Sequence, residues 1–317
     1  MKGQTLTDPQ TLIESLESNI ADAIYGKEQA VRMCLVALLA GEHVLLEDVP
    51  GVGKTLMAKA IAKSVSGDFS RIQFTPDLLP SDIVGSSVYN SKDGSFRFNR
   101  GPIFANIVLA DEINRTPPRT QSALLEAMSD RQISADGETH ELPSPFMVVA
   151  TQNPFEFEGT YPLPESQLDR FLIRISLGYP SRDDERRVLE DHRQRRPIES
   201  LQPAVSAEQV VELQQAVRNV TIETSIHDYL LDIVDATRNS DELHVGVSTR
   251  AAISVTRAAQ ALAIISGRDF VVPDDVKQLA VPAMSHRVIA KGFFHGGQRE
   301  AIERIVRRII DTVVVPA

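Results

Sequence analysis

A glycine-rich loop, placed between a short apolar run and a helical pattern, constrains the fold of this chain more than any other feature. The apolar run is His43-Val-Leu-Leu46, the loop contains Gly51-Val-Gly-Lys-Thr55, and Thr55–Ser66 has apolar residues at helical spacing. Strand, loop and helix in this order are the context in which backbone N–H groups and a helix N-terminus bind phosphate. The pattern therefore predicts a phosphate-binding loop in an α/β fold.

The loop departs from the strict phosphate-loop pattern at one position. The pattern G-x-x-x-x-G-K-[ST] requires glycine at position 48, where this chain has Asp48. The N–H groups that would surround phosphate belong mainly to residues 51–55, and aspartate at the start of a turn often bonds nearby N–H groups. We therefore expect Asp48 to accept hydrogen bonds from the loop and to point away from the phosphates, with Pro50 stiffening the turn.

Further apolar runs alternate with helical patterns up to residue 180. They predict strands at 71–74, 107–110, 146–150 and 171–175, and helices at 8–23, 26–40 and 120–128. Strands that alternate with helices indicate a parallel sheet covered by helices. Ser87–Phe98 and Gln132–Leu142 interrupt this rhythm, and each has an Asp-Gly pair that predicts an inserted hairpin.

The pattern changes after Tyr179-Pro180, where strand signals stop. Helices are predicted at 182–194, 206–219, 225–239, 248–267, 273–284 and 299–313. We therefore expect two domains, an α/β domain over residues 1–180 and a smaller helical domain over residues 181–317.

An acidic pair at the end of a second apolar strand supports the nucleotide interpretation. Ile107-Val-Leu-Ala110 runs directly into Asp111 and Glu112. In nucleotide hydrolysis, Lys54 would reach the β- and γ-phosphates and Thr55 would ligate Mg²⁺. Asp111 would supply the carboxylate that the water molecules bound to the metal require. Glu112 could then act as the general base that polarises the attacking water.

Three more polar residues are candidates whose role the residues alone leave open. Asn153, after the apolar run that ends at Ala150, could hold the attacking water or contact the γ-phosphate, or it could be a turn residue before Pro154. Arg170 precedes a predicted strand and Arg250 opens a predicted helix. Guanidinium groups stabilise a transferring phosphoryl group, but either arginine could equally form a surface ion pair.

Composition lowers the expectation of a nucleic-acid or membrane protein. The chain of 317 residues has a formal net charge of −10, and neither predicted domain is basic, whereas nucleic-acid binding draws its affinity from phosphate neutralisation. The N-terminus has no secretory signal pattern, and no apolar stretch reaches the roughly 20 residues that span a bilayer. We therefore expect a cytoplasmic protein, and its one cysteine, Cys34, excludes an intrachain disulfide.

The chain resembles the MoxR family of AAA+ ATPases over nearly its whole length. The resemblance lies in long and idiosyncratic strings rather than in the phosphate loop alone. These are Ile72-Gln-Phe-Thr-Pro-Asp-Leu-Leu-Pro-Ser-Asp-Ile83, Gly101-Pro-Ile-Phe-Ala-Asn106, Leu109-Ala-Asp-Glu-Ile-Asn-Arg115, Ala150-Thr-Gln-Asn-Pro154, and Glu158-Gly-Thr-Tyr-Pro-Leu-Pro-Glu165 followed by Gln167-Leu-Asp-Arg-Phe171.

The resemblance implies a role for each candidate. Asp111 and Glu112 correspond to the Walker B motif, Asn153 to sensor 1, Arg170 to an arginine finger donated to the neighbouring subunit, and Arg250 to sensor 2, which reaches the γ-phosphate from the helical lid. The expected nucleotide-binding residues are the Walker A loop with its flanks and the segment passing the adenine: Pro50, Gly51, Val52, Gly53, Lys54, Thr55 and Leu56, with Tyr25 and Gly26.

The resemblance also implies a fold and an assembly. The fold is α/β, a P-loop NTPase three-layer core with a parallel sheet and β-hairpin insertions near 78–98 and 132–142, plus a smaller all-α lid domain. The implied cofactors are ATP or ADP and Mg²⁺. The implied assembly is a homo-oligomer, a hexameric ring, that acts as a chaperone-like remodelling ATPase on partner proteins, often ones with a von Willebrand factor A domain.

Three other functions remain as alternatives at this point. Magnesium-chelatase motor subunits share the insertions, although the strings above favour MoxR. A nucleic-acid-dependent ATPase is disfavoured by charge and by the lack of a basic stripe with interleaved aromatic residues. A small-molecule kinase would explain the phosphate loop but neither the helical domain, the insertions nor Arg170.

Overall fold

The computed structural model describes residues 8–92, 94–135, 137–154, 159–194, 197–292 and 297–316. Three residues named above lie outside these ranges: Asp93 and Asp136 of the two expected Asp-Gly turns, and Glu158 of the family string.

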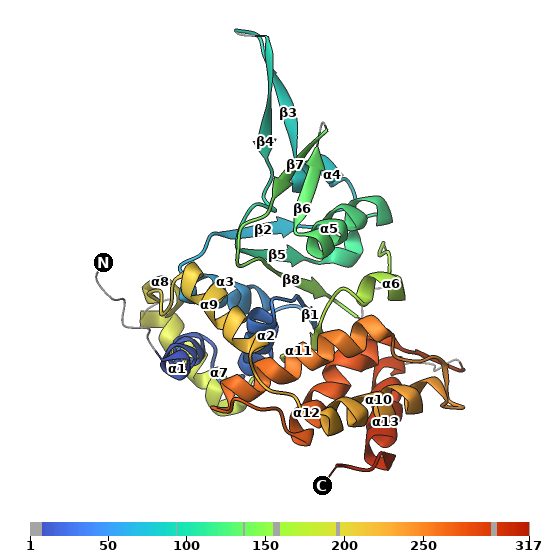
Figure 1. Ribbon diagram of the computed structural model, residues 1–317. Helices are drawn as coiled ribbons and strands as arrows, with labels where there is room; N and C mark the ends of the chain where they lie inside the picture. Colours follow the sequence, from blue (N-terminus) through green and yellow to red (C-terminus); the bar gives the residue numbers. More distant parts are fainter. Residues whose placement is uncertain are drawn as a thin grey trace, which may run out of the picture.

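Five parallel strands form the central sheet (Figure 1). Their order is β2 (Phe69–Gln73), β5 (Ile107–Asp111), β8 (Met147–Gln152), β1 (Val44–Glu47) and β9 (Ile173–Ile175). The two strands that precede the acidic pair and Asn153 are therefore neighbours, and β8 also pairs with β1, which enters the phosphate loop. This order places the three candidate motifs side by side at the carboxyl edge of the sheet.

Helices cover both faces of the sheet, as the unbroken apolar strands predict. Leu46 and Leu109 share one hydrophobic cluster with α1 (Pro9–Ala21), α2 (Glu28–Ala40) and α3 (Lys54–Ser64). Alternate strand residues, such as Leu45 and Val108, belong to a second cluster on the other face, with α4 (Pro80–Val84) and α5 (Pro118–Asp130). The predicted α/β class with a three-layer core is confirmed.

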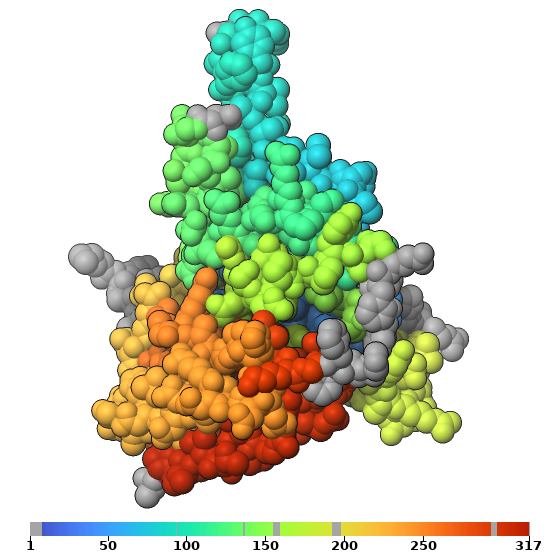
Figure 2. Space-filling view, turned by 90° about the vertical axis from the view of Figure 1, so that its right-hand side faces the viewer, coloured from blue at the N-terminus to red at the C-terminus, as the bar shows by residue number. Residues whose placement is uncertain are grey.

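Two antiparallel hairpins are inserted at the β2 side of the sheet. The first is formed by β3 (Gly85–Asn90) and β4 (Ser95–Arg100), and the second by β6 (Gln132–Ala135) and β7 (Glu138–Glu141). The first projects well beyond the body of the molecule in both views (Figures 1 and 2). The rings of Phe98 and His140 stack with centroids 4.2 Å apart and join the two hairpins near their bases.

The six helices predicted after residue 180 are present, with ends within two residues of the prediction. They are α7 (Arg182–Gln194), α9 (Ala207–Arg218), α10 (Thr224–Arg238), α11 (Thr249–Ile265), α12 (Pro273–Met284) and α13 (Gln298–Thr312). Side-chain caps fix two of the starts, because Ser206 accepts from the N–H of Gln209 and Ser248 from that of Ala251.

The expectation that strands stop after residue 180 was wrong in one detail. β10 (Leu243–Val245) pairs with β11 (Ile289–Ala290) in a short antiparallel ribbon, and a four-residue helix, α8 (Pro197–Ser200), follows α7. Strands of two or three residues are too short to show a period-2 pattern in the sequence. The ribbon ties the loop before α11 to the segment that follows α12.

The helical lid shares its core with the N-terminal helices. α11 packs against α2, and α9 packs against both. One hydrophobic cluster therefore runs from the sheet through α1 and α2 into the lid, including Leu38, Leu213 and Leu262. Division of the chain at 180 and 181 remains a proposal about its domains. No helix in the described part of the chain is long and apolar enough to cross a membrane.

Candidate active site

A cavity of about 370 Å³ lies where β1, β5 and β8 end. Because the strands are parallel, their carboxyl ends meet at one edge, and the loops that follow them face one another. The cavity is lined by Pro50, Gly51, Gly53, Lys54, Thr55, Leu56, Asp111, Glu112 and Asn153. Of the residues expected in the phosphate loop, only Val52 is not among the lining residues; it is partly buried against the hydrophobic core.

The phosphate loop has the backbone geometry that an anion site requires. Gly51 and Gly53 have φ of 87° and 98°, a region that favours glycine. A Cβ built on either residue would meet no atom within 4 Å beyond its chain neighbours, so both glycines border open space. α3 begins at Lys54, which directs a helix N-terminus at this space.

The Lys54 ammonium lies within the loop. Its Nζ donates to the carbonyl of Asp48 at 2.5 Å and to that of Gln152 at 3.4 Å. These carbonyls belong to the ends of β1 and β8, so the ammonium is held at the floor of the cavity. A bound phosphate would compete with backbone carbonyls for this donor.

Asp48 accepts hydrogen bonds as expected and does not line the cavity. Its Oδ1 accepts from the N–H of Val49 at 2.8 Å, and its Oδ2 accepts from Ser176 Oγ at 2.7 Å and from the N–H of Gly178 at 2.6 Å. Burial alone would raise the pKa of this carboxyl, but the hydrogen bonds outweigh it and hold the pKa below its usual value. Asp48 therefore joins the loop to the segment after β9.

Asp111 is held by two side chains that sequence reasoning did not single out. Its Oδ1 accepts from Thr151 Oγ1 at 2.6 Å, and its Oδ2 accepts from Arg71 Nη2 at 2.7 Å and Nε at 3.1 Å. Arg71 stands on β2 and Thr151 on β8, the two neighbours of β5. Only the strand order reveals these contacts, since the three residues are 40 positions apart along the chain.

Glu112 is oriented by neighbours on both sides. Gln73 Nε2 donates to its Oε2 at 2.9 Å, and Arg115 Nε lies 3.2 Å from the same oxygen. The backbone N–H of Glu112 donates to Thr151 Oγ1 at 2.8 Å. Its φ of 59° is in the left-handed region, which turns the chain sharply after the strand and places the side chain at the cavity.

The residues present fit a magnesium ion bound together with a nucleotide. Thr55 and Asp111 offer a hydroxyl and a carboxylate in the same cavity, which are oxygen ligands of the kind that Mg²⁺ prefers. Within the described ranges, no group of three or more metal-ligating side chains is present. Mg²⁺ is commonly bound by one or two protein oxygens with the rest from water and substrate phosphates, so this sparse set is suitable.

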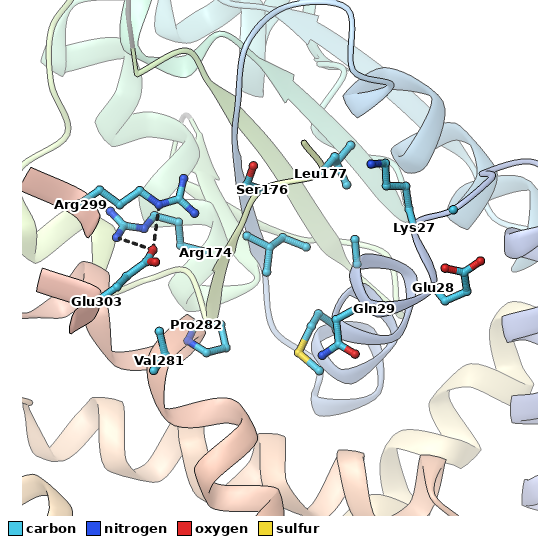
Figure 3. Close-up of a pocket in the computed structure, with 14 residues that line it drawn as sticks. Lys27, Glu28, Gln29, Arg174, Ser176, Leu177, Val281, Pro282, Arg299 and Glu303 are labelled. Carbon is cyan, nitrogen blue, oxygen red and sulfur yellow. Dashed lines mark hydrogen bonds and ion pairs between the residues drawn. The ribbon is translucent and has the colours of Figure 1, made fainter. Parts of the chain in front are cut away.

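A second cavity, of about 350 Å³, lies between the start of α2, the β9 segment and the lid helices α12 and α13 (Figure 3). Gly26 and Lys27 line it, as does Ser176, whose hydroxyl bonds Asp48. Tyr25 does not line it. Its hydroxyl donates instead to Asp191 of α7 at 2.5 Å, which raises the pKa of Tyr25, and the Arg187 guanidinium lies 4.4 Å from the ring centroid.

An ion-pair network closes one wall of this second cavity. Glu47, the last residue of β1, lies 3.5 Å from Arg174 of β9 and 3.2 Å from Arg299 of α13. Glu303 of α13 lies 2.9 Å from Arg299 (Figure 3). Burial lowers the pKa of Arg174, whereas Glu47 beside it raises that pKa. The network joins the lid to the strand that leads into the phosphate loop.

Arg170 and Arg250 lie together, and neither lines either cavity. Arg170 Nη1 donates to the carbonyl of Leu125 and, at 2.9 Å, to Ser129 Oγ, and Arg250 Nη2 donates to the same Oγ at 3.4 Å. Both contacts are at the end of α5. Within one chain, the contact that places Arg250 is therefore this bond to α5, and its role as sensor 2 stays a prediction.

Comparison with known proteins gives two family matches. The ATPase family associated with various cellular activities (AAA) matches residues 43–173, and the AAA lid domain matches residues 235–309. The relatives include the Bacillus subtilis uncharacterized protein YeaC, 50% identical over 98% of this chain and 96% of its own length. They also include the Mycobacterium tuberculosis chaperone MoxR1, 42% identical over 92% of this chain and 79% of its own length.

A solved structure is similar to this chain over nearly its whole length. The crystal structure of a Cytophaga hutchinsonii protein, provisionally described as an ATPase, has a TM-score of 0.89 and 38% sequence identity, and covers 98% of this chain and 96% of that one. A more distant relative is a magnesium-chelatase subunit ChlI homolog of Methanocaldococcus jannaschii, 31% identical over 59% of this chain and 51% of its own length.

Proposed function

The chain belongs to the MoxR family of AAA+ ATPases, and from this premise we propose that it hydrolyses ATP in a homo-oligomeric ring that remodels or matures partner proteins. One observation carries the proposal. The phosphate loop and the acidic pair share one cavity, whereas Arg170 and Arg250 lie together elsewhere on the chain. The site becomes complete when a neighbouring copy presents its arginines to this cavity.

The cavity residues have separate roles in this proposal. Gly51–Thr55 bind the phosphates through backbone N–H groups and the Lys54 ammonium, while Thr55 and Asp111 hold Mg²⁺. When bound, the metal neutralises charge that develops on the phosphate oxygens. Glu112 accepts the proton of the attacking water, and Asn153 orients that water or contacts the γ-phosphate. The adenosine occupies the second cavity, beside Gly26 and Lys27.

Arg170 and Arg250 act on the nucleotide of the adjacent subunit. A guanidinium stabilises the equatorial oxygens of a transferring phosphoryl group, and arginines supplied in trans are worth roughly 10³–10⁵ in rate. Their shared partner, Ser129, places the two guanidinium groups on one surface. We propose a hexamer as the closed assembly and the cytoplasm as its location.

A mixing experiment tests the shared site. Arg170→Ala has an intact cavity but no finger, and Glu112→Gln has a finger but no general base. In a trans arrangement each variant alone is inactive, and mixed rings regain turnover at Arg170→Ala cavities that face a Glu112→Gln neighbour. Absence of any regained turnover, in mixtures shown by cross-linking to contain both variants, would rule out the trans arrangement.

The partner is a separate part of the proposal. We propose a protein with a von Willebrand factor A domain as the client or adaptor. Affinity purification of the ATP-bound Glu112→Gln variant, followed by mass spectrometry, identifies what the ring engages. Recovery of no such protein, while other proteins are enriched reproducibly over the Lys54→Ala variant, contradicts this choice of partner.

A metal-chelatase-like motor is the second candidate, favoured by the relative named as a magnesium-chelatase subunit homolog. That relative covers only 59% of this chain, whereas MoxR1 covers 92%. The same purification separates the two candidates, because a chelatase motor would recover metal-insertion subunits. A nucleic-acid-dependent ATPase is the least favoured alternative, and ATPase activity stimulated by DNA at physiological salt would revive it.

A further inference from the structure

The segment Asp169-Arg170-Phe171 links the short helix α6 (Glu165–Leu168) to β9 and carries the proposed trans arginine. The Phe171 side chain is fully buried in the hydrophobic cluster that contains α5. Arg170 points to the end of α5, where Ser129 accepts its hydrogen bond. The position of the Arg170 guanidinium therefore depends on how the two flanking backbone units are held.

The lid holds both of these backbone units through Arg287. Arg287 Nη2 donates to the carbonyl of Asp169 at 3.1 Å and to that of Phe171 at 2.9 Å. Arg287 Nε lies 3.3 Å from Asp169 Oδ1. The guanidinium thus binds the backbone on both sides of Arg170. Among the described contacts, none joins it to the Arg170 side chain.

The Arg287 guanidinium is buried, and its removal from water has a cost in free energy. The Arg287 side chain is 1% exposed, and removal of a guanidinium from water costs several kcal/mol, on the order of what a good ion pair returns. Its Nη1 has no hydrogen-bond partner among the described residues. Replacement of a whole buried ion pair by apolar side chains of similar volume is often neutral or stabilising. A buried pair such as Arg287 and Asp169 is therefore weak evidence for a role in stability, and a positioning role deserves a test.

The adjacent residue strengthens the same attachment. His286 Nε2 lies 2.8 Å from the carbonyl of Phe171, and burial lowers the pKa of His286 well below its ordinary value. The ring is consequently neutral and donates its Nε2–H to this carbonyl. Two consecutive lid residues thus bind the same backbone segment.

The same part of the lid borders the second cavity. Val281 and Pro282, in the last turn of α12, line that cavity (Figure 3). Ser285–Arg287 form the single 3₁₀ turn that follows α12 directly. One short piece of chain therefore touches the proposed adenosine site at one end and the Arg170 segment at the other. A shift of the lid over its own nucleotide would move both.

We propose that Arg287 is a positioning residue for Arg170, so that the lid of one subunit sets the arginine that serves the nucleotide of the next. This inference rests on the proposed trans role of Arg170. It adds that the finger is not an independent loop residue, because its backbone is fixed by a buried lid guanidinium. Nucleotide bound under the lid would then influence hydrolysis in the adjacent subunit.

The test uses Arg287→Lys and Arg287→Met in the full chain. Lysine keeps the charge, but its ammonium ends one bond short of the Nη2 position and it lacks the Nε–H that faces Asp169; methionine removes every donor. We expect kcat to fall about 10- to 100-fold, the loss typical of an Å-scale misplacement, while the Kd for a fluorescent ATP analogue changes less than about threefold. Retained ATP affinity identifies variants that are folded, so lysine decides the question if methionine does not fold.

Complementation separates a positioning role from a general lid defect. Rings mixed from Arg287→Lys and Glu112→Gln should regain turnover, because the Arg287→Lys cavity is intact and its neighbour supplies a correctly held Arg170. Arg268→Met is the matched control. Arg268 pairs at 2.6 Å with Asp275, near the start of α12, and none of its described contacts is with the Arg170 segment. Its kcat should stay within twofold of the wild type, a change of at most about 0.4 kcal/mol.

Three outcomes decide between the hypotheses. A folded Arg287→Lys variant with wild-type kcat overturns the inference. A loss of kcat that Glu112→Gln does not restore, although Arg170→Ala is restored in the parallel mixture, also overturns it and leaves the proposed function intact. If Arg170→Ala is not restored either, the trans arrangement itself is wrong.

Discussion

Gln73 Nε2 donates a hydrogen bond of 2.9 Å to Oε2 of Glu112, and Arg71 Nη2 donates one of 2.8 Å to the other end of the same amide, Gln73 Oε1. The second bond fixes which way the amide faces, so that its NH₂ group is directed at the carboxylate. A surface strand residue thereby orients the proposed general base.

This relationship makes Glu112→Gln a clean test of the base. The variant keeps an oxygen that can accept from Gln73, so the side chain should stay in place while the basic carboxylate is lost. We expect kcat to fall at least about 100-fold, within the 10²–10⁴ range of general-base catalysis, with ATP affinity retained. The measurement is steady-state ATPase activity beside equilibrium binding of a fluorescent ATP analogue.

The exposed Glu212→Gln change on α9 is the control for Glu112→Gln, and it should leave both quantities unchanged. Turnover of Glu112→Gln close to that of the wild type would exclude Glu112 as the base. Light scattering with ATP should also show an assembled ring, because the variant binds nucleotide without consuming it.

Arg170→Ala should uncouple ATP binding from hydrolysis. Arg170 does not line the cavity of its own chain, so its loss leaves the affinity for ATP nearly unchanged. We expect kcat to fall by roughly 10³–10⁵, as for arginine fingers in other NTPases. Titration of ATPase activity against protein concentration, with the exposed Arg218→Ala as control, measures this effect. A loss of ATP affinity as large as the loss of kcat would contradict the role of Arg170 as a trans arginine finger.

Arg71→Met should lower the Mg²⁺ concentration at half-maximal turnover, because Arg71 competes with the metal for Asp111. Arg71 holds Asp111 Oδ2 through two hydrogen bonds, and its side chain is 49% exposed. An ion pair this exposed is worth up to about 1 kcal/mol, which is about a fivefold change in the half-saturating metal concentration. A magnesium titration at saturating ATP, with exposed Arg97→Met as control, gives the comparison. A higher metal requirement would show that Arg71 assists the site rather than competing for Asp111.

Asp48→Asn should destabilise the chain more at neutral pH than at low pH. The carboxylate accepts from Val49, Ser176 and Gly178, and an amide cannot accept all three, so we expect a loss of about 1–3 kcal/mol in the free energy of unfolding. Because the folded pKa of Asp48 is lowered, its stabilisation is complete above about pH 4 and disappears as pH falls through the folded pKa. Urea denaturation at pH 7 and near pH 3 checks both statements; an equal loss at both pH values contradicts them.

His43 should make the fold sensitive to mild acid. The ring is buried, with Nδ1 accepting from the N–H of Val148 at 3.0 Å and Nε2 lying 3.1 Å from the carbonyl of Met128, and burial lowers its pKa to about 4. The unfolded chain takes up this proton near pH 6.5 and the folded chain near pH 4, so stability is lost as pH falls across that window. The full loss is on the order of 3 kcal/mol.

Comparison with His43→Gln isolates this contribution from the other titrating groups. The variant lacks the proton uptake, so its deficit in unfolding free energy relative to the wild type should shrink as pH falls from 7.5 to 4.5. A deficit that stays constant over this range would show that His43 does not titrate between the two states.

The phosphate loop and the acidic pair were predictable because their signals are local. Gly51, Gly53 and Lys54 lie within four residues, and the apolar run before Asp111 directly indicates a buried strand. The helices after residue 180 were predictable for the same reason, since helical periodicity needs only neighbouring residues. Tyr25 shows the limit of local signals. Its position near the adenine comes from the resemblance and stays a prediction, and its hydrogen bond to Asp191 of α7, 166 residues further along the chain, has no local signal.

The sequence by itself therefore determined the fold class, the five strands of the central sheet, the longer helices and the residues of the proposed phosphate loop. Only the tertiary structure decided which side chains orient those residues and where the arginines lie. Arg71 and Gln73 reach the acidic pair because β2 pairs with β5, and Arg287 reaches the backbone around Arg170 because the end of α12 packs under β9. These contacts depend on strand order and helix packing, which are set by the burial of the whole core and leave no periodic signal in the chain.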